Sequence, residues 1–461
     1  MRLLVYLLLL GSSPSFAQTS ELPPAASGEQ ETFWNRFWIS MQANFIRQQD
    51  PAFYAKYTGP NSFIPEKEHA TSRVETLYTG FAITKNLEIL CDVESAGGAG
   101  LSSALGIAGF TNVDVVRNPT LGEDPYISRV MLHYTLPLSK DSVDATRNPL
   151  SLAGGVPERR LEFRLGKMST VDFFDLNSVG SDSHLQFINW AIVNNGAFDY
   201  AADTRGYTYG LVMEYYDKNW AARFGEMLMP TVANGIDLDW NIARARGENF
   251  EAEYHPSLIA RRSTVVRALG FVNHANMGDY RVAIDAFLSG KDPVPDIILH
   301  RKQGTVKYGF GWNAEQELTG TLRVYGRLGW NDGATESYAY TEIDRTAQIG
   351  GDLRGKAWRR DQDKIGAAYV TNGISGDHRR YLALGGQGFI LGDGGLRYGL
   401  EKIFETYYTA HVWRGISVAL DYQYVTNPGY NQDRGPVSVV GFRIHVEDAV
   451  PFGSFGQGSG K

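Results

Sequence analysis

Apolar and polar residues alternate along several segments of the chain, most regularly in Ile416–Thr426. Successive side chains of a β-strand point to opposite sides, so a period of two predicts a strand with two different faces. One face of this segment is apolar and the other is mostly polar: Ile416, Val418, Leu420, Tyr422 and Tyr424 alternate with Ser417, Ala419, Asp421 and Gln423.

The alternation recurs elsewhere in the chain. Residues 318–330 carry Leu322, Val324, Leu328 and Trp330 on one face and Arg323, Tyr325 and Arg327 on the other. Tyr280–Leu288 sets Tyr280, Val282, Ile284 and Leu288 against Arg281 and Asp285, which also predicts a strand. Further strands are predicted at residues 87–94, 129–136, 305–313 and 437–447. Each spans about 9–11 residues, the length that a tilted strand needs to cross a bilayer.

Alternation fits both a soluble sheet, whose polar face meets water, and an outer-membrane barrel, whose polar face lines the lumen. Strand length favours the barrel, as do the aromatic residues near strand ends, which are typical of membrane interfaces: Tyr134, Tyr215, Tyr216, Trp220, Trp330, Tyr407, Tyr408, Trp413 and Tyr424. We therefore predict an all-β fold, a transmembrane antiparallel up-and-down β-barrel of about 16 strands. A β-propeller or sandwich is the alternative.

Composition narrows the possible classes. The 461 residues include 51 Gly, 25 Tyr, 23 Phe and 9 Trp but one Cys, which excludes a disulfide scaffold. The longest apolar run, residues 3–10, is too short for a membrane-spanning helix. The net charge of −7 argues against nucleic acid as a partner. A mean hydropathy of −0.26 fits a barrel with one wet and one lipid-facing side.

The N-terminus has the layout of a secretory signal peptide. Arg2 precedes the apolar run, and the small residues Ser15 and Ala17 come just before Gln18. We predict a signal peptide at residues 1–17, a flexible polar leader at 18–33, the barrel at 34–447 and a Gly- and Ser-rich tail at 448–461. One long segment, residues 172–203, lacks alternation around residues 187–193. It is predicted either to fold into the lumen as a constriction or to form an external loop.

Several stretches together resemble carbohydrate-selective porins of the OprB type. They are YQYVTNPGYNQDRGPVSVVGFRIHVE at 422–447, VDFFDLN at 171–177, NGAFDYAADTRGYTYG at 195–210, DQDKIGAAY at 361–369 and LEKIFETYY at 400–408. The resemblance implies a 16-stranded outer-membrane barrel that conducts glucose and related sugars by diffusion. One departure concerns the end of the chain, because fourteen residues follow the last family-like strand, whereas porin barrels usually finish on an aromatic residue.

Sugar diffusion requires polar groups that replace water on the sugar and aromatic faces that stack on it, in a site weak enough to release its ligand. Candidate pore-lining residues are Glu88, Asp92, Arg164, Arg205, Arg281, Asp285, Arg323, Arg327, Asp421, Arg443 and Glu447. The alternative for these charges is that they pair across strands and hold the wall. Candidate stacking residues are Trp190, Phe198 and Tyr200, which otherwise pack within their loop.

Other chemistry has weaker support. Asp237, Asp239, Asn241 and Glu248 match positions of a calcium loop, but Ile242 stands where such loops need Gly. We find no enzyme signature and expect neither a cofactor nor a metal. The predicted partners are monosaccharides or small oligosaccharides and outer-membrane lipid, and a monomer is favoured over a trimer. A general porin, a closed structural or adhesion barrel and an outer-membrane hydrolase remain as alternatives.

Overall fold

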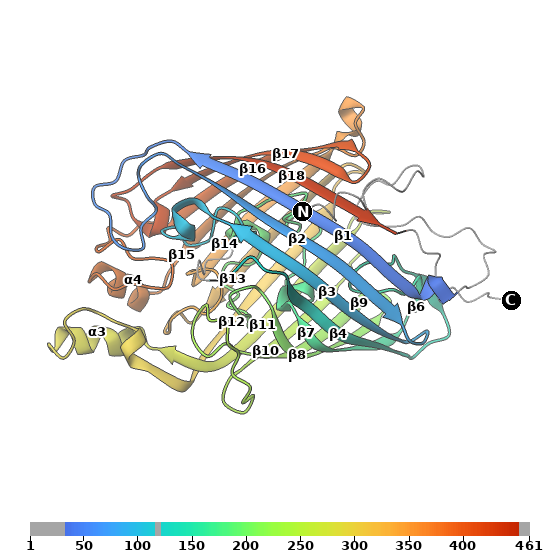
Figure 1. The fold of residues 1–461 in the computed structure, drawn as a ribbon, viewed down its shortest axis with the longest axis horizontal. Coiled ribbons are helices and arrows are strands. Elements are labelled where there is room, and N and C mark those ends of the chain that lie inside the picture. The colour runs from blue at the N-terminus through green and yellow to red at the C-terminus, as the bar shows by residue number, and fades with distance from the viewer. Residues whose placement is uncertain (1–32, 116–120, 451–461) are drawn as a thin grey trace.

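The computed structural model describes residues 33–115 and 121–450, which form one closed β-barrel of sixteen antiparallel strands (Figure 1). The barrel closes where β1 pairs with both β2 and β18. Its strands are β1 Phe37–Asp50, β2 Glu68–Ala82, β3 Leu87–Gly98, β4 Tyr126–Pro137, β7 Arg160–Met168, β8 Thr208–Asp217, β9 Trp220–Leu228, β10 Arg246–Tyr254, β11 Thr264–Gly278, β12 Arg301–Glu317, β13 Leu322–Asn331, β14 Arg345–Arg354, β15 Lys364–Gly373, β16 Glu401–Trp413, β17 Ile416–Thr426 and β18 Val437–Ala449. The predicted fold class is confirmed.

The remaining elements are short and lie in the connections. Strands β5 (Ser142–Asp144) and β6 (Gly155–Pro157) form a separate two-stranded sheet between β4 and β7. The helices are α2 Trp190–Val193, α3 Tyr280–Leu288 and α4 Gly376–Ala383, with 3-10 turns η1 Phe33–Arg36, η2 Leu101–Ala104, η3 Thr170–Asp172, η4 Ile298–His300, η5 Gly355–Trp358 and η6 Pro428–Tyr430. No helix in the described ranges is long and apolar enough to span a membrane.

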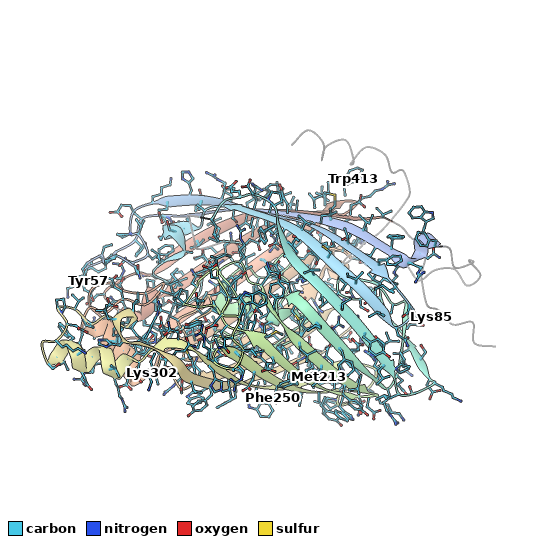
Figure 2. The ribbon with its side chains drawn as sticks, turned by 60° about the horizontal axis from the view of Figure 1, so that its bottom comes forward. Tyr57, Lys85, Met213, Phe250, Lys302 and Trp413 are labelled. Atoms are coloured by element: carbon cyan, nitrogen blue, oxygen red, sulfur yellow. The ribbon has the colours of Figure 1, made fainter. Side chains whose placement is uncertain are left out.

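The strand faces follow the alternation of the sequence. In β17, Leu420 is 61% exposed on the outside, while Asp421 and Gln423 are buried on the inside. The apolar face can meet lipid because each strand of the ring pairs with both of its neighbours, which leaves no open sheet edge in the described barrel. Figure 2 shows Phe250 of β10 on the outer surface. Polar side chains therefore face the lumen.

The two ends of the barrel differ. At one end, which we call the short-turn end, most connections, such as residues 218–219 and 414–415, are brief, and residues 138–159 with β5 and β6 are the long exception. The opposite end, the long-connection end, carries residues 51–67, 99–115, 121–125, 169–207, 279–300, 332–344 and 374–400. Helices α3 and α4 lie at this end (Figure 1). In Figure 2, Lys302 lies toward the long-connection end and Lys85 toward the other.

The strand prediction for Tyr280–Leu288 is wrong, because this segment is helix α3. Asp279 caps the helix by accepting a hydrogen bond from the Val282 amide, and the helix buries Tyr280, Ala283 and Ile284. These positions are spaced three and four apart, so they also fit a helical face. Arg281 and Asp285 therefore belong to a connection and not to the barrel wall.

One of the predicted interfacial aromatic residues faces the lumen. Tyr407 is buried on the inner side of the barrel, so it is not part of an interfacial belt, whereas Trp413, Trp220 and Tyr134 are exposed.

The predicted signal peptide and most of the leader and tail lie outside the described residues. Strand β18 continues through Asp448 to Ala449, and Phe442 lies on its outer face.

Candidate channel site

The long connection between β7 and β8, residues 169–207, lies inside the barrel. Its backbone and side chains bond to inward-facing residues from strands on several sides of the lumen. The contacts join Asp175 to Glu251 of β10, Asn177 to Asn313 of β12, Asn194 to Gln348 of β14, Ile188 to Glu405 of β16 and Asn189 to Gln423 of β17. We call residues 169–207 the lumen segment. Of the two predicted alternatives, a segment folded into the lumen and an external loop, the structure shows the first.

Two wall arginines hold the lumen segment. Arg327 is fully buried and donates to the carbonyls of Ile192, at 2.9 Å, and Val193, at 3.1 Å, and it pairs with Asp175 at 3.3 Å. Arg443 of β18 donates to the carbonyls of Ser183, at 2.7 Å, and Gln186, at 2.9 Å. A guanidinium has five donors in a rigid fork, which suits it to several backbone oxygens at once.

Local sequence shapes the middle of the lumen segment. Asn189 caps the short helix α2 by accepting from the Ala191 amide, and its own side-chain amide donates to Gln423 at 2.9 Å. Glu405 accepts from the Ile188 amide at 2.6 Å and from the Asn189 amide. These bonds satisfy backbone donors at a helix start, which cannot reach water when the segment is buried.

A series of cavities passes beside the lumen segment. An upper cavity of about 280 Å³ shares Gln42, Tyr78 and His184 with a middle cavity of about 190 Å³. The middle cavity shares Asp182, Leu185 and Glu447 with a lower cavity of about 630 Å³. A side cavity of about 370 Å³ adjoins the lower one through residues such as Arg323. We call Gln42, Tyr78 and His184 the junction, because they line both the upper and the middle cavity.

The upper cavity combines aromatic rings with paired charges. Tyr207 donates to Glu94 at 2.8 Å, and Arg129 binds Asp172 with nitrogen–oxygen distances of 2.7 and 2.6 Å. Other residues of its wall include Tyr126, Trp190, Tyr200, Arg205 and Tyr340. The Arg205 guanidinium lies 3.9 Å from the centre of the Tyr126 ring. Such a wall offers hydrogen-bond donors, acceptors and ring faces to a ligand that carries hydroxyl groups.

The structure separates the predicted lining residues into groups. Arg205, Trp190 and Tyr200 line the upper cavity, and Arg323 and Glu447 line the lower one. Trp190 is only 8% exposed, because its ring stacks on Tyr340 with centroids 4.4 Å apart. Phe198 packs between Tyr200 and Phe271. Asp421 is buried beside Gln423. Arg281 and Asp285 lie on α3, and Arg281 pairs with Asp377 instead of facing the lumen.

Most of the remaining candidates belong to one ion-pair ladder along the inner wall. Arg164 of β7 bonds Glu162 at 2.7 Å and Glu214 of β8 at 2.8 Å. The ladder continues through neighbouring strands in the order Glu88, His133, Glu162, Arg164, Glu214, Arg223, Glu253, Arg267 and Glu315. Asp92 pairs with Arg129 next to it. The alternative in which charges pair across strands therefore describes Arg164, Glu88 and Asp92.

Sequence reasoning missed the three junction residues. Gln42 lies on β1 and Tyr78 on β2, two strands that were not predicted individually. The period of two in β2 could have indicated the orientation of Tyr78, because Ser72, Val74 and Thr76 are buried on the same side of this strand. His184 belongs to the lumen segment and stacks on His445 with centroids 5.1 Å apart. Nothing local in the sequence indicates which strand it meets.

The four residues of the calcium candidate do not form one site either. Asp239 binds Arg244, with a nitrogen–oxygen distance of 2.9 Å, and Glu248 lies on β10 next to Arg246. Asp237 and Asn241 lie in the connection between β9 and β10. Across residues 33–115 and 121–450, no group of three His, Cys, Asp or Glu side chains is placed to hold a metal ion.

Comparison with known proteins supports a channel. The family described as carbohydrate-selective porin, OprB family, matches residues 76–447. The solved high-pH structure of Pseudomonas putida OprB aligns over 90% of this chain and 94% of its own, with a TM-score of 0.68 and 15% sequence identity. The low-pH structure of that protein gives a TM-score of 0.49 at 11% identity, with 90% and 93% covered. No curated protein sequence matches the chain.

Proposed function

The chain belongs to the OprB family of carbohydrate-selective porins, and we propose that its barrel lets monosaccharides and small oligosaccharides diffuse passively through the outer membrane. Family and fold are those of a bacterial outer-membrane channel and not of an enzyme. The observation that carries the sugar proposal is the series of cavities beside the lumen segment, whose walls are rich in hydrogen-bonding groups and, in the upper cavity, in aromatic rings.

A sugar needs to be held weakly at the junction. Gln42 offers an amide, His184 an imidazole, and the half-buried Tyr78 a ring face and a hydroxyl. Charged neighbours above, such as Glu94 and Arg205, replace part of the water that a sugar sheds. A dissociation constant near 1 mM corresponds to about −4 kcal/mol, which permits saturation without trapping the ligand.

The test is conductance in a planar lipid bilayer. The full chain should form open channels, and added glucose should reduce the ion current in a saturable way because the sugar occupies the junction. Open channels that no sugar blocks would replace the proposal with a general porin. A barrel that carries no current would favour a closed structural or adhesion protein.

We also infer the path to the membrane and the assembly state. Residues 1–17 direct export and are removed, so the N-terminus of the protein isolated from outer membranes should lie near Gln18. The barrel closes within one chain, so no second copy is needed to complete it, and we infer a monomer. Light scattering of the detergent-solubilised protein measures the assembly state, and a threefold mass would contradict the monomer.

A further inference from the structure

Two basic side chains on the outer surface of the barrel, Arg345 and Lys402, have no ion-pair or hydrogen-bond partner among residues 33–115 and 121–450. Arg345 is the first residue of β14 and Lys402 is the second of β16, so both lie at the long-connection end. Both are exposed and point outward, and neither side chain makes an ion pair or hydrogen bond within the described chain. Of the other outward-facing arginines near this end, Arg73 pairs with Glu123 at 2.9 Å and Arg246 with Glu248 at 2.9 Å, and Arg47 donates a hydrogen bond to Thr71 at 3.2 Å.

The strand register places the two cations on either side of β15, and we call the outer surface formed by Arg345, Thr371 and Lys402 the notch. Thr371 of β15 lies directly opposite both Ala347 of β14 and Lys402 of β16, while Arg345 lies opposite Gly373. Arg345 and Lys402 are therefore two strands and two residues apart, which sets their Cα atoms about 12 Å apart. Thr371 and Gly373 lie between them, and Leu400 and Tyr398 pack over Gly373, so a headgroup would rest on this surface between two long basic side chains.

The surface beneath the notch is apolar and aromatic. Two residues further toward the middle of the barrel, Ile349, Tyr369 and Phe404 lie directly opposite one another on β14, β15 and β16. They are 65%, 43% and 38% exposed. Trp330 lies opposite Arg345 on β13. An apolar and aromatic row below a pair of cations is complementary to a molecule with an anionic head and hydrocarbon chains.

We propose that this notch binds a phosphorylated lipid of the outer leaflet, with phosphate oxygens on Arg345 and Lys402, the headgroup over Thr371, and an acyl chain along Ile349, Tyr369 and Phe404. In outer-membrane barrels the short turns face the periplasm and the longer loops face outward, so the notch lies at outer-leaflet headgroup depth. Guanidinium and ammonium groups both bind phosphate through charge-assisted hydrogen bonds. This proposal does not depend on sugar transport.

The notch can be tested by native mass spectrometry of the full chain in detergent. Lipid A with two phosphates serves as the probe, and the variant combines Arg345→Gln with Lys402→Gln. The matched control combines Lys85→Gln with Arg414→Gln, which removes two exposed basic groups at the short-turn end. Each basic group near a membrane surface contributes about a factor of five in affinity, so the notch variant should bind lipid A about thirtyfold more weakly. The control should bind as the unmodified protein does.

Three results would overturn the proposal. They are unchanged lipid binding by the notch variant, an equal loss in the short-turn control, and displacement of the lipid by inorganic phosphate at matched concentration, which would indicate a site for soluble anions. Folding is checked by heat-modifiable migration in SDS gels, which both variants should retain because the altered side chains make no ion pair or hydrogen bond with the described part of the chain. Sugar block of the current should also be unchanged, so a failure here is distinguishable from a failure of the transport proposal.

Discussion

At the scale of single residues, position inside the barrel decides what an arginine does. Arg323 and Arg327 share one face of β13, and the sequence predicts the same lining role for both. The structure distinguishes them, because Arg327 is covered by the lumen segment while Arg323 borders the lower cavity and pairs with Asp352. Alternation fixes which side of the wall a residue faces. It carries no information about which residues a distant loop covers.

Replacement of Arg327 by Ala should loosen the lumen segment. Asp175 and several carbonyls would lose their buried partner, which costs about 3–5 kcal/mol. We expect a larger, noisier single-channel conductance and a lower unfolding midpoint. The matched variant Arg323→Ala should leave conductance noise unchanged and shift ion selectivity toward cations. If both variants behave alike, the distinction between a buried holder and a lining residue is wrong.

Tyr78 allows the ring and the hydroxyl of the junction to be tested separately. Tyr78→Ala should weaken glucose block about tenfold, because stacking of a sugar on an aromatic face is worth on the order of 1 kcal/mol and the opening also widens. Tyr78→Phe keeps the ring and should retain most of the block. Half-saturation of the current by glucose measures both. Equal weakening in the two variants would assign the effect to the hydroxyl.

At the scale of elements, the strands were predictable and the connections were not. Strand β17 has the predicted bounds, because one face meets lipid and the other water along its whole length. The sequence does not distinguish helix α3 from a strand by periodicity, since Tyr280, Ile284 and their neighbours satisfy both periods over nine residues, and only the N-cap residue Asp279 indicates a helix. The inward course of residues 169–207 depends on contacts such as Asp175 with Arg327, far apart in sequence.

Helix α4 provides a pH-dependent contact at the long-connection end. His378 stacks on Tyr280 of α3, with centroids 4.4 Å apart, and faces Asp344 at 3.2 Å and Glu342 at 3.6 Å. Burial alone would lower the pKa of His378, but Asp344 and Glu342 outweigh it and raise the pKa to about 9. The unfolded value is about 6.5. Protonated His378 therefore stabilises this packing fully below pH ~6.5, and the stabilisation is lost as the pH rises through about 9.

Hydrogen exchange of the α4 amides, corrected for intrinsic rates, measures this loss. Protection should be highest near pH 6 and fall between pH ~7 and ~9.5. In His378→Gln the fall should disappear, because no group at that position then titrates. Exchange that stays constant over this range in the unmodified protein would contradict the assignment, as would a fall that persists in the variant.

At the scale of the whole molecule, the ion-pair ladder joins eight neighbouring strands from β3 to β12 across the lumen wall. Arg223 is central to it, since it bonds Glu214 at 3.1 Å, Glu251 at 2.9 Å and Glu253 at 3.0 Å.

Replacement of Arg223 by Met should leave these carboxylates buried without their shared partner, at a cost of about 3–5 kcal/mol. The midpoint of the heat-induced mobility shift in SDS gels should fall for the whole barrel at once, because each strand is held by its neighbours. Arg223→Lys should fall less, since one ammonium cannot meet all of these carboxylates in the same geometry. The exposed Arg397, which is 3.8 Å from Asp433, provides the control, and Arg397→Met should change the midpoint little. A midpoint for Arg223→Met equal to that of the control would show that backbone pairing alone holds the wall.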